Sequence, residues 1–316
     1  MLPAFRTSVL SLPVVTLAFV ACSSTASRSS FDAPAPAADG GAGSSGGTFG
    51  TGTTDAASNQ SGCAEAAKLV YVLSLEGDLH SFAPAAKKFT KIGALNCRLG
   101  AKRFIPISMA VDRKAVAWVN MREDAGVGIG EDTIFKVDTA TASCVPTSIR
   151  GSMGGMGFST NDAATDQESL YVIGEGSTPL RAALVKVDLV KQQLLPVADL
   201  KESVDLELTG TGDGRLFGFL ISSPLALAQV DKATSAFSDR VSLTKLETPQ
   251  APMFAFSFWG GDFYFYTATG TGASTTTNVT RYRPSDRSLD TSYMRGIGFH
   301  IVGAGVSTCA PTVAPK

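Results

Sequence analysis

The strongest constraint on the fold is a strand-like segment that recurs about every 50 residues after residue 63. Its copies are Leu69–Leu73, Ala115–Val119, Leu170–Ile173, Arg215–Leu220 and Phe263–Tyr266. When Tyr71, Ala117, Tyr171, Phe217 and Tyr264 are set as equivalent positions, the steps between copies are 46, 54, 46 and 47 residues. Self-similarity at such a period is the signature of a repeat architecture. We therefore expect five similar all-β units, each containing this segment as its second strand.

Other strands recur around the second one. A third strand is expected at Leu79–Ala83, Ile134–Asp138, Leu184–Asp188, Leu227–Asp231 and Val279–Arg283. Three of these end in an aspartate, whose carboxylate accepts hydrogen bonds from the backbone of a tight turn. A fourth strand follows the turn, for example at Lys88–Leu95 and Leu194–Leu200. A first strand precedes the second in four units, at Ile107–Val111, Met156–Thr160, Leu206–Thr209 and Phe254–Phe258.

Only the first unit lacks a first strand, and a matching segment appears instead at residues 299–306. Such sharing of one unit between the two ends of a chain closes a β-propeller and leaves no open sheet edge at the seam. We therefore predict a propeller of five four-stranded blades. The period and the runs at Leu69–Val72 and Leu170–Ile173 resemble bacterial propellers of the lactonase and quinoprotein type. Those relatives commonly have more blades, and a β-sandwich is the alternative fold.

The amino terminus has the features of an export signal. Arg6 precedes the apolar stretch Ser8–Val20, which is too short to span a bilayer. The stretch ends in Leu17-Ala18-Phe19-Val20-Ala21-Cys22, which resembles the lipobox of bacterial lipoproteins. The resemblance implies that Cys22 is acylated and becomes the first residue, although Phe19 stands where the family usually has Leu, Val or Ile. The alternative is ordinary cleavage near Ala21 or Ala26, which releases a soluble product.

Composition then divides the chain. We expect a signal peptide over residues 1–21 and a disordered tether over residues 22–62, because this Ser, Gly and Ala-rich stretch has too little apolar surface to fold. The propeller domain is expected over residues 63–310, and residues 311–316 form a short disordered tail.

The four remaining cysteines, Cys63, Cys97, Cys144 and Cys309, suggest two disulfides in an exported chain, with three possible connectivities. The propeller interpretation places Cys63 and Cys309 on either side of the closing seam, which favours a bond between them. Cys97 and Cys144 are then paired by elimination, and free thiols are the alternative for these two.

The sequence offers little material for catalysis. Lys plus Arg (27) nearly balance Asp plus Glu (28), which argues against a nucleic-acid surface. The only histidines, His80 and His300, fall in or beside expected strands, and the carboxylates considered for a channel site, Asp112 and Asp205, are far apart in the sequence. We therefore nominate no catalytic, cofactor or metal residue and expect no cofactor.

The expected function is a non-enzymatic binding or scaffolding module at the cell envelope, anchored to a membrane through Cys22. The envelope partner is a protein or a glycan, the domain is a monomer, and the membrane is the outer one or the cell surface; a periplasmic or secreted soluble form is the alternative. Long connections expected at residues 120–133 and 267–278 share one face of the propeller and mark the binding surface. A lactonase-like hydrolase with a metal in the central channel is the competing hypothesis.

Overall fold

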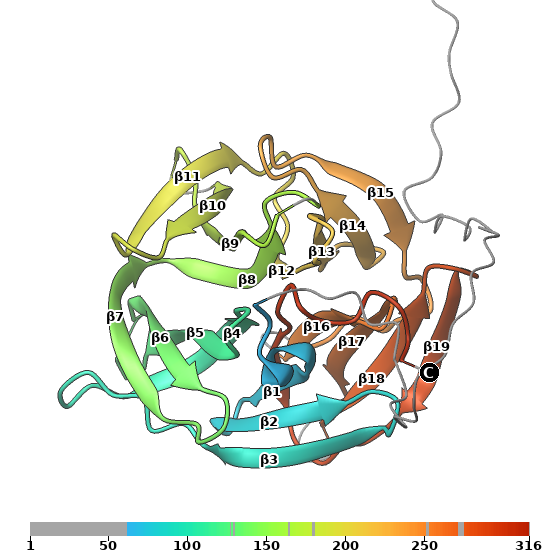
Figure 1. Ribbon diagram of the computed structural model, residues 1–316, viewed down its shortest axis with the longest axis horizontal. Coiled ribbons are helices and arrows are strands. Elements are labelled where there is room, and N and C mark those ends of the chain that lie inside the picture. The colour runs from blue at the N-terminus through green and yellow to red at the C-terminus, as the bar shows by residue number, and fades with distance from the viewer. Residues whose placement is uncertain are drawn as a thin grey trace, which may run out of the picture.

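The fold described here is that of a computed structural model. It describes residues 62–126, 128, 130–163, 165–178, 181–250, 253–270 and 275–315. Within these residues the strands form five antiparallel sheets of four strands, arranged as blades around a ring (Figure 1). The chain is therefore a five-bladed β-propeller, as predicted, and not a β-sandwich.

Each blade runs from an inner strand at the centre of the ring to an outer strand at its rim. Blade 1 contains β20 (Ile301–Gly305), β1 (Val70–Ser74), β2 (Asp78–Ala83) and β3 (Lys88–Ala94). Blade 2 contains β4 (Phe104–Val111), β5 (Val116–Glu123), β6 (Asp132–Asp138) and β7 (Cys144–Gly151). Blade 3 contains β8 (Met153–Thr160), β9 (Glu168–Glu175), β10 (Ala182–Asp188) and β11 (Gln193–Asp199). Blade 4 contains β12 (Leu206–Gly210), β13 (Leu216–Leu220), β14 (Ala226–Val230) and β15 (Phe237–Ser242). Blade 5 contains β16 (Phe254–Trp259), β17 (Asp262–Thr269), β18 (Thr276–Arg283) and β19 (Ser288–Met294).

The ring closes between the two ends of the domain. Strand β20 pairs antiparallel with β1, in a register that sets Tyr71 opposite Gly305 and Leu73 opposite Gly303. A short 3-10 helix, η1 (Glu65–Lys68), precedes β1 near the centre of the ring (Figure 1). The predicted sharing of blade 1 between the two termini is therefore confirmed.

Apolar packing between neighbouring blades forms the core. The second strands β1 and β13 are buried along their whole length, because both of their faces contact an adjacent blade. Between blades 4 and 5 the contact is made largely by phenylalanines, including Phe217 against Phe263 and Phe219 against Phe265, with ring centroids 4.9 and 4.8 Å apart. The aromatic residues of the repeat thus serve inter-blade packing.

Two disulfides join parts of the chain that the ring brings together. Cys63 is bonded to Cys309 across the closing seam, over a sequence separation of 246 residues. Cys97, which follows the outer strand of blade 1, is bonded to Cys144 at the start of the outer strand of blade 2. Neither Cys97 nor Cys144 is a free thiol, and paired cysteines of this kind indicate an extracytoplasmic protein.

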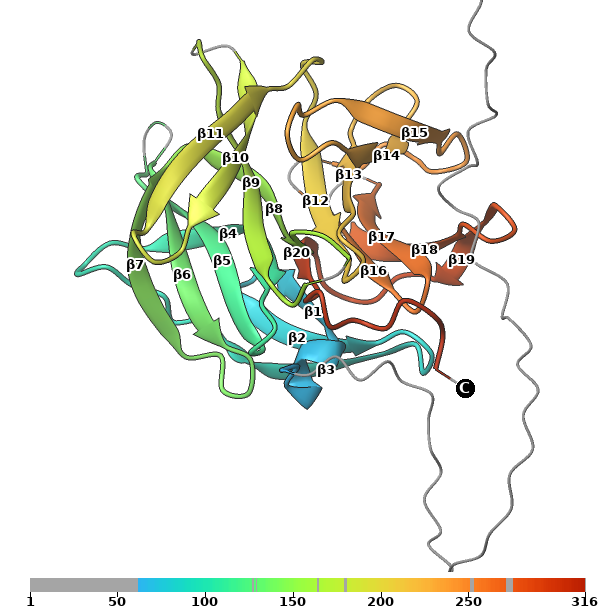
Figure 2. The same ribbon diagram turned by 45° about the horizontal axis from the view of Figure 1, so that its top comes forward.

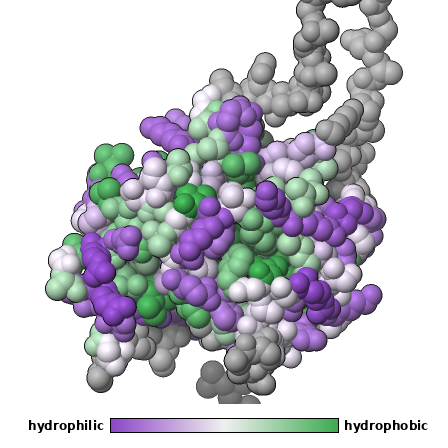
Figure 3. All heavy atoms as spheres, turned by 90° about the horizontal axis from the view of Figure 1, so that it is seen from below, coloured by the Kyte–Doolittle hydropathy of each residue, from purple (hydrophilic) through white to green (hydrophobic). Residues whose placement is uncertain are grey.

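The predicted anchor Cys22, the signal peptide and the tether lie outside the described residues. Among the helices that are described, none is long and apolar enough to cross a membrane. At the rim seen in Figure 3, hydrophilic and hydrophobic side chains are interspersed.

Candidate functional site

Around the centre of the ring, the inner strands of neighbouring blades approach one another closely. A Cβ atom added at Gly155 would lie 2.4 Å from the carbonyl oxygen of Leu206, and one added at Gly210 would lie 2.0 Å from that of Phe158. A Cβ atom added at Gly303 of β20 would lie 3.1 Å from the backbone of both Ser108 and Met109 in β4. Small residues are required here because backbone meets backbone. Inner strands of neighbouring blades are therefore in direct backbone contact at these positions.

A hydrogen bond spans the axis between two blades that are not neighbours. The Ser108 hydroxyl of blade 2 donates to Glu207 Oε2 of blade 4 at 2.7 Å, and the backbone N–H of Met156 in blade 3 donates to Ser108 Oγ at 3.2 Å. Ser108 is fully buried and Glu207 is 5% exposed. Burial raises the pKa of Glu207 to about 8, although Ser108 and two backbone N–H groups oppose the shift. At neutral pH the carboxyl is largely protonated and ties three blades together.

One mouth of the centre is covered by the closing segments. We call this side, which carries η1 and residues 306–310, the closure face; it faces the viewer in Figure 1. The Ser307 hydroxyl donates to the carbonyl of Ala67 at 2.7 Å, and both residues are fully buried. Beside them, the Thr308 hydroxyl donates to Glu168 Oε2 at 2.8 Å, while the backbone N–H of Arg113 donates to Oε1 at 2.8 Å. Burial raises the pKa of Glu168 to about 7.

The polar residues considered in the sequence do not converge. Asp112 accepts hydrogen bonds from the backbone N–H groups of Lys114 and Val116 and is a turn residue, whereas Asp205 is exposed. His80 stacks on Phe299, and burial lowers its pKa. The residues that the structure describes contain no group of three or more His, Cys, Asp or Glu arranged to hold a metal ion.

His300 lies apart from these residues, on the side of the ring opposite the closure face. Its Nδ1 is 2.7 Å from Glu76 Oε1, and its Nε2 is 2.9 Å from the carbonyl of Thr275. These contacts connect the link before β20 to the β1–β2 hairpin and to the segment before β18.

The surface around His300 is the loop face, formed by the connections between second and third strands and by the links between blades. Figure 2 shows several of these connections standing above the strands, on the side away from η1. The second and third strands have five or six residues in blades 1 and 4, and seven or eight residues in blades 2, 3 and 5. At about 3.3 Å per residue, two extra residue pairs lengthen a hairpin by about 7 Å.

The expected loops are shorter than the sequence suggested. Residues 120–133 and 267–278 were expected to be connections, but pairing continues to Arg122 opposite Asp132 and to Thr269 opposite Thr276. The connections proper are residues 124–131 and 270–275. Blade 3 has a comparable hairpin, with Ala182 opposite Glu175, that sequence reasoning missed. Gly174 and Gly176 interrupt the apolar pattern there and hide the extension.

Buried polar contacts fix the base of the blade 2 hairpin. Asp132 is 1% exposed and receives two hydrogen bonds from Arg122, at 2.6 and 3.0 Å, and one from the backbone N–H of Met153 at 2.8 Å. Asn120 Nδ2 donates to the carbonyl of Met153 at 2.9 Å, while its buried Oδ1 has no protein partner among the described residues. A bidentate pair of this kind sets geometry as well as energy.

The other two long hairpins also make polar contacts with neighbouring segments, of which only the one at Thr277 is buried. In blade 3, the backbone N–H of Ser177 donates to Asp199 Oδ1 at 2.8 Å. In blade 5, the Thr276 and Thr277 hydroxyls accept hydrogen bonds at 2.9 Å from the backbone N–H groups of Gly298 and Ile301. The loop face therefore carries three elongated hairpins held by polar contacts, an arrangement that suits binding.

Comparison with known proteins gives no family. No protein-family model matches the sequence, and no curated protein matches it significantly. Similar solved structures include a protein of unknown function from Bacteroides caccae, which is 11% identical, with a TM-score of 0.40 over 74% of this chain and 84% of the other. A glycoside hydrolase is 12% identical, with a TM-score of 0.42 over 58% and 47% of the two chains. A GH43 protein from Bacillus licheniformis is 13% identical, with a TM-score of 0.39 over 63% and 42%. Such low values carry no functional argument, and the propeller assignment rests on the strand pairing described above.

Proposed function

We propose that this protein is a lipid-anchored binding module of the bacterial cell envelope, and that its propeller binds an envelope protein or glycan through the loop face. The observation that supports this most strongly is the contrast between the two candidate sites. Neighbouring inner strands meet at glycines and the buried Ser108–Glu207 bond crosses the centre, whereas the loop face carries elongated hairpins. Binding residues are commonly presented in this way, on loops held by a rigid scaffold.

The competing hypothesis of a metal-dependent hydrolase needs several carboxylates or histidines that converge on an accessible channel. The five inner strands contain one acidic residue, Glu207, and it is buried. No observation on the described residues favours this second function.

Anchoring through Cys22 and placement in the outer membrane complete the proposal. The two disulfides support the extracytoplasmic side, and the lipobox-like run before Cys22 supports the anchor. Two or three acyl chains hold a protein stably on a membrane, because each buried CH₂ group contributes about 0.8 kcal/mol. Labelling with radioactive palmitate tests this point: wild type should incorporate label and Cys22→Ala should not. Equal labelling of the two would refute the anchor.

Site-specific photo-crosslinking tests the loop face. A benzophenone amino acid is placed at exposed positions on two long hairpins, Asp124 and Thr178, and at the exposed control positions Lys114 and Lys191 near closure-face turns. We expect crosslinked adducts in cells from the first pair only. Adducts from the control positions alone, or no adduct from any position, would contradict the proposal.

A further inference from the structure

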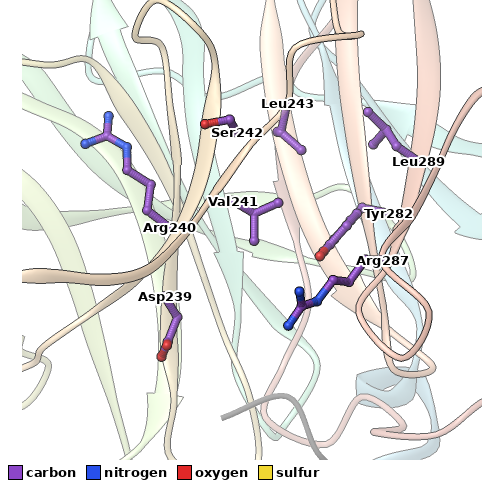
Figure 4. A pocket seen from close by; sticks show the side chains of 8 residues that line it. All are labelled: Asp239, Arg240, Val241, Ser242, Leu243, Tyr282, Arg287 and Leu289. Carbon is purple, nitrogen blue, oxygen red and sulfur yellow. The ribbon is translucent and has the colours of Figure 1, made fainter. Parts of the chain in front are cut away.

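A cleft of about 370 Å³ opens between the outer strands of blades 4 and 5 (Figure 4). It lies between the outer strands β15 and β19. It is lined by Asp239, Arg240, Val241, Ser242, Leu243, Tyr282, Arg287 and Leu289. Its volume is in the range of small-molecule sites, which typically begin at about 300 Å³.

The other four rim junctions are bridged by a bond between neighbouring blades. Blades 1 and 2 are joined by the Cys97–Cys144 disulfide. Blades 2 and 3 are joined by Gln192 Oε1, which accepts hydrogen bonds from the backbone N–H and the hydroxyl of Ser148 at 2.7 Å.

Blades 3 and 4 are joined by the Ser235 hydroxyl, which donates to the carbonyl of Asp199 at 2.6 Å. Blades 5 and 1 are joined by the Tyr293 hydroxyl, which donates to the carbonyl of Pro84. At the junction of blades 4 and 5 the outer strands β15 and β19 enclose the cleft.

One wall of the cleft is apolar. Val241 and Leu289 are partly buried against the phenylalanine-rich core between blades 4 and 5, and their remaining surface faces the cleft. Tyr282, which is 3% exposed, forms the floor between them (Figure 4). An aliphatic group placed here would remove apolar surface from water on both sides, which is favourable at about 25 cal/mol per Å².

The other end of the cleft is polar, with Arg240 and Asp239 on β15 and Arg287 on the facing turn; Arg240 is paired with Glu202 at 2.9 Å. Figure 4 shows the Tyr282 hydroxyl and the Arg287 guanidinium pointing into the same part of the cleft. Burial raises the pKa of Tyr282, so its phenol remains a protonated donor at neutral pH. The neighbouring Asp286 is bound by Arg283 at 3.1 Å. The guanidinium and the phenol together offer the donors that a carboxylate accepts.

We propose that the cleft between blades 4 and 5 is a binding site for a small organic monocarboxylate with an aliphatic body. Arg287 and Tyr282 hold the carboxylate, and Val241 and Leu289 contact the aliphatic part. This site does not depend on the partner proposed to bind at the loop face.

The repeat supplies a conservative variant for the test. Arg287 occupies the turn between third and fourth strands with φ of 56°, and Gln192 occupies the same turn of blade 3 with φ of 55°. Glutamine is therefore compatible with this backbone, and Arg287→Gln removes the charge without changing the turn. Arg98→Gln, at an exposed position after β3, removes a positive charge elsewhere and serves as the matched control.

The experiment is a titration of the full ¹⁵N-labelled chain with hexanoate, hexanamide and acetate, followed by amide chemical shifts. We expect saturable shifts for Val241, Ser242 and Leu289 with hexanoate, and affinity at least tenfold lower for hexanamide, which lacks the charge, and for acetate, which lacks the aliphatic body. Arg287→Gln should weaken hexanoate binding at least tenfold and Tyr282→Phe several-fold, whereas Arg98→Gln should leave it unchanged. Equal affinity for hexanoate and hexanamide, the same loss in Arg98→Gln as in Arg287→Gln, or no saturable shift at these amides would overturn the proposal.

Discussion

The buried carboxyl at the centre of the ring makes stability depend on pH in a direction opposite to that of an ordinary surface acid. Burial raises the pKa of Glu207 from 4.5 to about 8 in the folded protein. In the unfolded chain the group ionises near 4.5. Between these values the unfolded chain has lost the proton that the folded protein retains, so the free energy of unfolding falls as pH rises. Below 4.5 and above 8 this contribution is constant.

The expected size of the effect follows from the shift. One pKa unit corresponds to about 1.4 kcal/mol, so raising the pKa from 4.5 to about 8 changes the free energy of unfolding by about 5 kcal/mol in total. About 4 kcal/mol of this change falls between pH 5 and pH 9. The stability of a whole domain is commonly about 5–15 kcal/mol, and the change should therefore be easy to measure.

Urea unfolding of wild type and Glu207→Gln, followed by the fluorescence of Trp118 and Trp259 with the disulfides intact, tests this prediction. The free energy of unfolding of wild type should fall by about 4 kcal/mol relative to Glu207→Gln from pH 5 to pH 9, because glutamine does not ionise. For Glu168→Gln, the difference in unfolding free energy from wild type should change only between about pH 4.5 and pH 7 and stay constant above pH 7, because the pKa of Glu168 is raised to about 7. Parallel pH profiles for wild type and Glu207→Gln would refute the assignment of a protonated Glu207.

Three further predictions concern packing and cross-links. Gly155→Ala should destabilise the domain by about 2 kcal/mol or more, because its Cβ would lie 2.4 Å from the Leu206 carbonyl oxygen. Gly154→Ala, whose Cβ would lie 3.8 Å from Ile173, is the control, and equal unfolding midpoints for the two variants would contradict the close approach. Replacing both Cys63 and Cys309 with Ser should cost about 2–5 kcal/mol in denaturant unfolding, and an unchanged midpoint would show that the seam does not depend on this bond. Arg122→Ala should lower the free energy of unfolding by about 3 kcal/mol, because the buried Asp132 loses its cationic partner. Lys102→Ala, which removes the exposed pair with Glu123, should lower it by less than about 1 kcal/mol, and similar losses in the two variants would contradict a special role for Asp132.

The blade architecture could be predicted because its determinants are local and repeated. A missing first strand at the amino terminus and a spare strand near Val302 point directly to ring closure, and the same geometry brings Cys63 next to Cys309. The turn role of the aspartates was also readable, since Asp138 and Asp231 accept hydrogen bonds from the backbone two and three residues further along.

The centre could not be predicted, because it depends on how strands from different blades are staggered against one another. In sequence, Glu207 is one polar residue in an alternating strand, and nothing local distinguishes a solvent-facing position from one on the axis. The partner Ser108 is 99 residues away. The hairpin lengths were underestimated because residues 120–133 and 267–278 were expected to be connections, whereas the β-branched threonines at 276 and 277 favour the paired strand β18.

The Ser108–Glu207 bond seals the middle of the ring, and the proposed binding surface lies on the loop face. Glu207 faces the axis, and Thr209, two residues further along β12, lies on the same side of the strand and is 3% exposed. The most direct test is the rate at which maleimide labels Thr209→Cys, compared with Ser203→Cys at an exposed position in the link before β12. A sealed centre predicts rapid labelling of Ser203→Cys and labelling of Thr209→Cys only under unfolding conditions. Equal, rapid labelling of both in the native protein would show an open channel and contradict this account.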